Sequence, residues 1–201
     1  MSYQLSKKEL RENKLKRKQF KDIPRNDIYI ILDSLKCAHN VGTILRLADS
    51  LLIKKVYICG DTIVPPNKKI RSSSRGAEKW VPWEYHENAV NIAKALKECG
   101  AQIVAVEVTN DSIDYREYSP KGPVCLILGR EYDGVSQELL DIADCSIHLP
   151  LLGMANSINV STAASVVMYD VYSKLELLKQ ESFDYSSKST SKNINSWNVI
   201  V

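Results

Sequence analysis

The sequence predicts an α/β domain whose mostly parallel sheet is flanked by helices. From residue 28 onward, short apolar runs alternate with amphipathic segments, which is the pattern of strands and helices in alternation. The runs are apolar at consecutive positions, as expected for parallel strands that are buried on both faces. The chain has 201 residues, of which 44% are hydrophobic and 25% charged, and this composition is typical of one soluble globular domain.

Six apolar runs are the expected strands. They occupy residues 28–33, 55–59, 80–85, 102–108, 123–129 and 145–151. The expected helices lie between and after these runs, at residues 40–52, 87–99, 136–143 and 157–179. Apolar side chains in the first two helices recur at helical spacing, and Gly100 closes the second. Small side chains fill the first half of the last helix, which would let another helix approach closely.

The two ends of the chain differ in composition from the domain, which we place at residues 25–179. Residues 1–24 form a basic arm, because residues 1–21 contain eight Lys or Arg and two Glu, a net charge of +6, so the other 180 residues sum to −3. We expect this arm to be a helix with little core contact that ends at Pro24, since its apolar residues recur every five positions. The tail at residues 180–201 is rich in Ser, Asn and Lys, which predicts disorder.

The sequence excludes several classes of protein. The arm has no apolar signal core and no stretch approaches 18 apolar residues, so we expect neither a secretory signal nor a membrane span. The five cysteines form no C-x-x-C pair, which favours reduced, buried thiols in the cytoplasm. A G-x-G-x-x-G loop, a complete P-loop and a G-x-S-x-G elbow are all missing. The three histidines lack zinc-binding spacing, so no metal site is expected.

Three polar clusters each follow a predicted strand, where open α/β sheets bind their ligands. They are HNVGTILR (39–46), LGREYDG (128–134) and LPLLGMANSINVSTAAS (149–165). In the first cluster, we expect Asn40 at a helix N-cap and Arg46 leaning back toward it. Glycines in the second let the backbone approach a ligand, and the third opens a helix whose exposed amides favour an anion. The alternatives are a capping Asn with a surface Arg, and a charged turn that closes a buried strand.

Taken together, the clusters resemble the three motifs of the SpoU/TrmH family of RNA ribose 2'-O-methyltransferases. The motifs read Asn-x-Gly-x-x-x-Arg, Leu-Gly-x-Glu-x-x-Gly and Leu-x-Gly-x-x-x-Ser-x-Asn-Val-Ser. Their residues in this chain are Asn40, Gly42, Arg46, Leu128, Gly129, Glu131, Gly134, Leu151, Gly153, Ser157, Asn159, Val160 and Ser161. The segment RSSSRGAEKW (71–80) is similar to the family's Gly-Ala segment. Each motif is weak alone, and the combination over residues 28–178 is specific.

The resemblance implies a C-terminal trefoil knot that forms a pocket for S-adenosylmethionine, and a homodimer in which the last helix contributes to the interface. It implies catalytic roles for Arg46, Asn40, Glu131, Ser157 and Asn159. The residues implied to bind the cofactor are Leu128, Gly129, Glu131, Ile147, Leu149, Met154, Ser157 and Asn159. Because a guanidinium keeps its proton, we expect Arg46 to clamp the adjacent phosphate and stabilise the developing alkoxide.

RNA is the partner that the resemblance implies. We expect phosphate contacts from the arm and from the NKKIRSSSRG loop (67–76), through Lys14, Arg17, Lys18, Lys68, Lys69, Arg71 and Arg75. The short arm, in place of a long N-terminal RNA-binding domain, favours transfer RNA over ribosomal RNA. Two alternatives stay open, a knotted RNA-binding protein without catalysis and an α/β protein that binds a nucleotide other than RNA.

Overall fold

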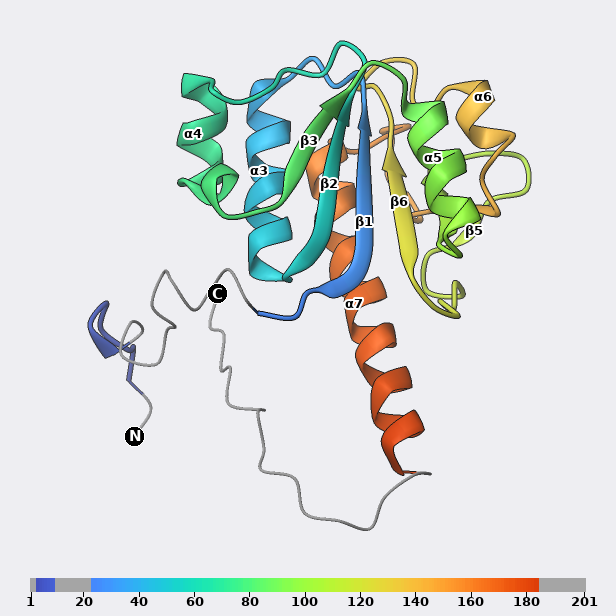
Figure 1. Cartoon of the computed structure of the whole chain (residues 1–201). Helices are drawn as coiled ribbons and strands as arrows, with labels where there is room; N and C mark the ends of the chain where they lie inside the picture. The colour runs from blue at the N-terminus through green and yellow to red at the C-terminus, as the bar shows by residue number, and fades with distance from the viewer. Residues whose placement is uncertain (1–2, 10–22, 185–201) are drawn as a thin grey trace.

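In the described part of the chain, seven strands form one parallel sheet (Figure 1). The computed structural model describes residues 3–9 and 23–184, with the side chains of the last helix described as far as Glu176. The sheet order is β3-β2-β1-β6-β4-β7-β5. The strands are β1 (Asn26–Asp33), β2 (Ile53–Cys59), β3 (Trp83–His86), β4 (Gln102–Val106), β5 (Ile113–Asp114), β6 (Val124–Leu128) and β7 (Cys145–His148). The prediction of a parallel α/β fold is confirmed.

Helices cover both faces of this sheet (Figure 1). On one face lie α3 (Ala38–Ser50) and α7 (Val160–Asp184), and on the other lie α5 (Ala89–Glu98) and α6 (Gln137–Leu140). Beside α3 lies α4 (Lys68–Ser74), which is followed by the short 3-10 helix η1 (Ala77–Lys79). A Cβ on Gly42 would lie 2.5 Å from the carbonyl oxygen of Ile70, so glycine allows α3 and α4 to pack this closely.

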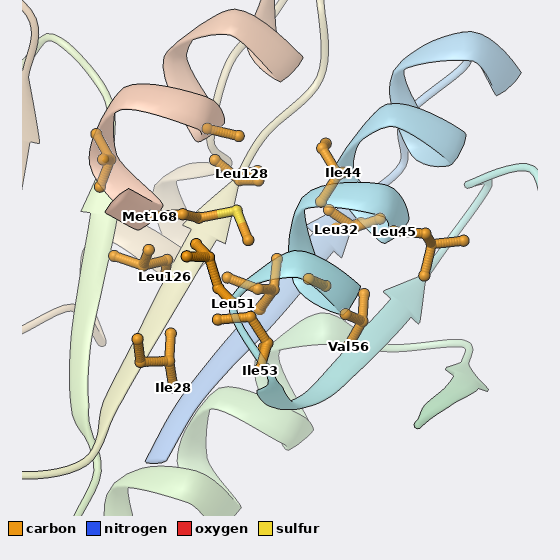
Figure 2. Packing of buried hydrophobic residues seen from close by; sticks show 14 of the residues in the cluster. Ile28, Leu32, Ile44, Leu45, Leu51, Ile53, Val56, Leu126, Leu128 and Met168 are labelled. Atoms are coloured by element: carbon orange, nitrogen blue, oxygen red, sulfur yellow. The ribbon is translucent and has the colours of Figure 1, made fainter. Parts of the chain in front are cut away.

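Side chains of β1 alternate between two buried hydrophobic cores. Ile28, Ile30 and Leu32 face α3 and α7, whereas Ile31 faces α5. Figure 2 shows the first core, in which side chains from both helices pack against those of the central strands. Burying each large aliphatic side chain stabilises the fold by about 1.5–3 kcal/mol. Burial on both faces is the physical reason why the strands read as continuous apolar runs.

Several predicted boundaries are wrong by two to five residues. The strand predicted at 80–85 is β3, which begins after Pro82 because proline cannot donate a hydrogen bond to the sheet. The strands predicted at 102–108 and 145–151 end at Val106 and His148, where the chain leaves the sheet. The helix predicted at 157–179 is α7, which begins at Val160 and continues to Asp184.

The basic segment 67–76, predicted as a loop, contains α4. Asn67 is the N-cap of this helix, and its Oδ1 accepts hydrogen bonds from the N–H groups of Lys69 at 2.8 Å and Ile70 at 3.3 Å. Sequence reasoning missed the helix because Ile70 is its one large apolar side chain, so no hydrophobic periodicity marks it. Residues 10–22 of the arm and 185–201 of the tail lie outside the described residues. In the described part of the arm, residues 3–8 are not helical. The prediction of a disordered tail is wrong for residues 180–184, which belong to α7.

The five cysteines are free thiols, but they are not all buried. Cys59 and Cys125 are buried, and this burial raises the pKa of Cys59 to about 12. Cys37 and Cys99 are exposed because they stand at helix ends, before α3 and after α5, so the prediction of buried thiols is wrong for these two. None of the helices within residues 3–9 and 23–184 combines the length and the apolar character needed to cross a bilayer.

Candidate functional site

The loops that follow β6, β4 and β7 enclose one cavity. These three strands are neighbours in the sheet, so their carboxyl ends meet at the same edge. The cavity has a volume of about 450 Å³, which is within the range of small-molecule sites. Its wall consists of Val106, Glu107, Val108, Leu128, Gly129, Arg130, Glu131, Tyr132, Gly134, Ile147, His148, Leu149, Leu151, Asn156, Ser157, Ile158, Asn159, Val160 and Ala163.

Seven of the eight predicted cofactor-binding residues line this cavity, namely Leu128, Gly129, Glu131, Ile147, Leu149, Ser157 and Asn159. The eighth, Met154, lies outside the wall, and its side chain is fully exposed on the loop between β7 and α7. Sequence reasoning missed Glu107, because the strand predicted at 102–108 included it. An acidic residue near the end of an apolar run was the available signal.

Two glycines fold the loop after β6 back on itself. The backbone N–H of Arg130 donates to the carbonyl oxygen of Gly134 at 3.0 Å, and the N–H of Gly134 donates back at 3.1 Å. Gly134 has a φ of +68°, which favours glycine. A Cβ on Gly129 would lie 2.3 Å from the backbone nitrogen of Val135, so the two arms of the loop touch through their backbones. This tight turn directs Glu131 toward the start of α3.

The Glu131 carboxylate caps α3 from outside the helix. Its Oε2 accepts from the N–H of Lys36 at 3.0 Å, and its Oε1 accepts from the N–H of Cys37 at 3.0 Å and from Nδ2 of Asn40 at 2.9 Å. The prediction of Asn40 as the N-cap is therefore wrong, because Cys37 holds that position and its own side chain provides no cap. A carboxylate also suits the positive end of the helix dipole.

Asn40 connects Glu131 to the start of α7. The Asn40 side chain is buried, and its Oδ1 accepts from Nδ2 of Asn159 at 3.0 Å. Asn159 in turn caps α7, because its Oδ1 accepts from the N–H of Ser161 at 2.9 Å and from the Ser161 hydroxyl at 2.7 Å. A continuous series of hydrogen bonds thus joins Glu131, Asn40 and Asn159, one residue from each of the three polar clusters.

Hydrogen bonding keeps Glu131 ionised. Partial burial raises the pKa of this carboxyl, but the hydrogen bonds from the Lys36 backbone, the Asn40 side chain and other backbone N–H groups outweigh burial and lower the pKa below its ordinary value. At neutral pH Glu131 therefore only accepts hydrogen bonds. The geometry gives it the task of holding α3 and Asn40 in place.

The structure does not bring Arg46 to Asn40. The two residues are six positions apart on α3, and at about 100° per residue their side chains lie on different faces of the helix. Asn40 is buried, whereas Arg46 is exposed and is not part of the cavity wall. Its guanidinium forms no hydrogen bond or ion pair with the described residues. Ser157 is also exposed, on the rim of the cavity.

The predicted RNA-binding residues that the structure describes are all on the surface. Lys68, Lys69 and Arg71 are exposed on α4, and the exposed Arg75 ends this helix with a φ of 54°. The others, Lys14, Arg17 and Lys18, fall outside the described residues. Among the residues that the structure describes, no three His, Cys, Asp or Glu side chains lie close enough together to hold a metal ion.

Comparison with known proteins assigns the chain to a family. Residues 27–169, which include all three polar clusters, match the model of one family. The chain belongs to the SpoU rRNA Methylase family.

Relatives and solved structures of the SpoU family resemble this chain over most of its domain. It is 31% identical to the tRNA (guanosine(18)-2'-O)-methyltransferase of Escherichia coli, over 72% of this chain and 62% of that protein. The chain thus spans less than two thirds of that relative's length. The TrmH/SpoU tRNA modifying enzyme of A. aeolicus shares its fold with a TM-score of 0.70 at 32% identity, over 84% of this chain and 83% of that one. The AdoMet-bound rRNA methyltransferase of Sinorhizobium meliloti gives a TM-score of 0.70 at 26% identity, over 78% of this chain and 60% of that one.

In this SpoU family member, Glu131→Gln is expected to reduce stability in a pH-dependent way. The carboxylate contribution is fully present above the ordinary carboxyl pKa of 4.5 and is lost as the pH falls through the lower pKa of the folded state. Because Glu131 is partly exposed, we expect a loss of about 1 kcal/mol at pH 7. Urea unfolding of both proteins from pH 7 to pH 3 measures the difference. The difference in free energy of unfolding between Glu131→Gln and the wild type should become smaller below pH 4.5. The control variant Glu98→Gln, at an exposed site, should show no such decrease. A constant difference between Glu131→Gln and the wild type would contradict the role of the carboxylate.

Proposed function

We propose that this chain transfers a methyl group from S-adenosylmethionine to a ribose 2'-hydroxyl of tRNA. One observation carries the proposal: hydrogen bonds join Glu131, Asn40 and Asn159 beside a cavity at the ends of β6, β4 and β7. The family relationship supports it, because the relatives of E. coli and A. aeolicus are named as tRNA 2'-O-methyltransferase and tRNA modifying enzyme. We propose a cytoplasmic enzyme, in keeping with the free thiols.

The residues of the cavity fit this cofactor. Leu128 and Ile147 lie near the carboxyl ends of β6 and β7, and Gly129 and Leu149 directly follow these strands. All four line the cavity, where their main chain can contact the adenosine. The missing Cβ of Gly129 lets the loop come close enough to form that wall. When bound, S-adenosylmethionine supplies a methyl group activated by a positively charged sulfur. Ser157, exposed on the rim, is placed to contact the bound molecules.

The reaction requires the ribose 2'-hydroxyl to lose its proton as its oxygen bonds to the methyl carbon and the carbon–sulfur bond breaks. A guanidinium does not accept that proton, so Arg46 holds the neighbouring phosphate and stabilises the negative charge that develops on the 2'-oxygen. The phosphate or a water molecule takes the proton. Asn40 and Glu131 act as positioning residues, because their polar atoms already bind one another and the ends of α3 and α7.

A homodimer accounts for the distance between Arg46 and the cavity of its own chain. Arg46 is exposed on α3, so it can reach the cavity of a second copy. Near the cavity, Tyr132, Leu152 and Met154 expose almost their whole side chains, as expected for residues that another subunit covers. The outer end of α7 extends beyond the sheet (Figure 1), where it is free to pack against a partner. We propose further that the C-terminal segment of the domain threads back as a trefoil knot, which forms the cofactor pocket.

The exposed basic residues support RNA as the substrate. Lys68, Lys69, Arg71 and Arg75 form a positive surface on α4, which packs against the helix that holds Arg46. Such residues bind phosphates and contribute affinity rather than sequence selection. We propose tRNA because the relatives of E. coli and A. aeolicus are named as a tRNA methyltransferase and a tRNA modifying enzyme.

Removal of residues 1–21 is expected to weaken tRNA binding and to leave cofactor binding unchanged. These residues hold eight of the 27 Lys and Arg side chains of the chain, and phosphate contacts supply most of the non-specific affinity. We expect the Kd for tRNA to rise by roughly tenfold or more at low salt, with a shallower dependence on salt concentration. Filter binding from 50 to 200 mM salt measures the Kd for tRNA and its dependence on salt concentration. Equal tRNA affinity with and without the arm at low salt would show that the arm makes no such contacts.

Incubation with S-adenosylmethionine labelled on the methyl group, together with total RNA, tests the proposed function. We expect label in the RNA, mainly in the tRNA fraction. A knotted RNA-binding protein without catalysis would bind RNA and transfer no label. Cofactor binding without RNA binding would indicate a protein that acts on another nucleotide. Either of these two results would overturn the proposal.

A further inference from the structure

Glu107 lies in the wall of the proposed cofactor cavity, between the two segments proposed to bind adenosine. It directly follows β4, and β4 lies in the sheet between β6 and β7. The ends of those two strands carry the backbone of Leu128 and Gly129 on one side and of Ile147 and Leu149 on the other. Glu107 is part of the cavity wall together with all four residues.

The Glu107 carboxylate is held in one orientation by two backbone groups. Its Oε1 accepts from the N–H of Val108 at 3.0 Å, and its Oε2 accepts from the N–H of Val135 at 2.9 Å. A Cβ on Gly134 would lie 2.2 Å from Oε2, so the glycine of the second cluster makes room for this carboxylate. The carboxylate is thus fixed against the loop that forms the cavity wall.

Two acceptor positions of this carboxylate remain for a ligand. An ionised carboxyl group accepts about four hydrogen bonds, and the backbone uses two. Among the described residues no Lys, Arg or His side chain forms an ion pair with Glu107. A fixed carboxylate in a cavity wall, without an ion pair to any described side chain, suits a ligand that brings two hydroxyl donors.

We propose that Glu107 binds the 2'- and 3'-hydroxyl groups of the cofactor ribose. The inference rests on the proposed function, because it assumes an adenosine-containing cofactor in this cavity. Carboxylates that follow parallel strands bind ribose hydroxyls in dinucleotide-binding folds, which shows that the chemistry is suitable. The position between the two adenosine-binding segments places Glu107 beside the nucleoside. Glu107 is then the residue that selects a ribose over a deoxyribose.

The test compares S-adenosylhomocysteine with its 2'-deoxy and 3'-deoxy analogues, using calorimetry on wild type, Glu107→Gln and Glu107→Asp. A hydrogen bond to a charged group contributes enough that each missing hydroxyl should weaken binding to the wild type by roughly tenfold or more. In Glu107→Gln this penalty should shrink to about threefold or less, because the neutral amide binds the diol weakly and has one acceptor oxygen. Glu117→Gln, a change of the same size at an exposed site outside the cavity, should keep the wild-type penalty.

The ratio between the ligands separates recognition from a structural role. If Glu107 only holds Val135, the substitution weakens all three ligands by the same factor and the deoxy penalty stays at its wild-type value, which would overturn the inference. An equal loss of affinity for the deoxy analogues in the wild type, Glu107→Gln and Glu107→Asp would also overturn the inference. Failure of the wild type to bind S-adenosylhomocysteine at all would instead refute the proposed cofactor. Thermal unfolding of each variant confirms that the protein measured is folded.

Discussion

Replacing Arg46 with lysine is expected to lower kcat for tRNA methylation by about 100-fold or more. Lysine keeps the positive charge, but it cannot hold a phosphate through two parallel N–H groups while it stabilises the 2'-oxygen. The Kd for S-adenosylhomocysteine should stay within about twofold of the wild-type value, because Arg46 lies outside the cavity wall. Steady-state methylation at saturating tRNA and cofactor measures kcat, and calorimetry measures the Kd.

Arg116→Lys is the matched control for this substitution. Arg116 is an exposed arginine that pairs with Asp114 away from the cavity, and a surface ion pair of this kind contributes little. Its kcat should equal that of the wild type. Near-normal turnover by Arg46→Lys would refute the proposed role of Arg46. If the homodimer shares its sites, a mixed dimer of an Arg46→Lys chain and a Gly129→Ala chain should have one working site. That site combines the intact cavity of the first chain with the intact Arg46 of the second.

Gly129→Ala is expected to abolish measurable cofactor binding. The new Cβ would lie 2.3 Å from the backbone of both Gly134 and Val135, and neither can move without opening the loop. The loop also carries Glu131, so α3 would lose its cap. We expect the Kd for S-adenosylhomocysteine to rise by about 100-fold or more, and the free energy of unfolding to fall by about 1–3 kcal/mol. Calorimetry and urea unfolding measure the two effects.

Gly122→Ala serves as the control, because a Cβ at Gly122 meets nothing within 4 Å. Gly122 stands before β6, on the same chain segment but at the other end of the strand. Its substitution should leave both quantities close to the wild-type values. If Gly129→Ala bound the cofactor as tightly as the wild type, the backbone contact in the loop would not be what shapes the cavity.

The fold could be predicted from the sequence because burial on both faces leaves a strong pattern in each central strand. β6 is apolar at every position and β1 at the five consecutive positions 28–32, and α3 and α5 show amphipathic spacing. Weak elements left no such pattern. α4 has one large buried apolar side chain, and β5 consists of two residues whose pairing depends on β7. Both are fixed by contacts with segments distant in the sequence.

The candidate site was predictable as a set of residues but not as a geometry. Asn40, Glu131 and Asn159 could be selected from their clusters, yet the hydrogen bonds that join them cross 91 and 119 positions of the chain. Sequence spacing suggested that Arg46 leans toward Asn40, whereas the helix places the two on different faces. Glu107 was included in the strand predicted at 102–108, because the apolar pattern does not fix where a strand ends, and β4 ends one residue before it at Val106.

The position of the transferred methyl group tests the central claim most directly. Wild-type protein is incubated with tRNA and labelled S-adenosylmethionine, and the RNA is then digested to nucleosides and analysed by mass spectrometry. The proposed site predicts one labelled nucleoside that carries the methyl group on its ribose 2'-oxygen, and loss of that product in Arg46→Lys. A methyl group on a base, or no labelled nucleoside from any RNA under conditions in which the cofactor binds, would contradict it.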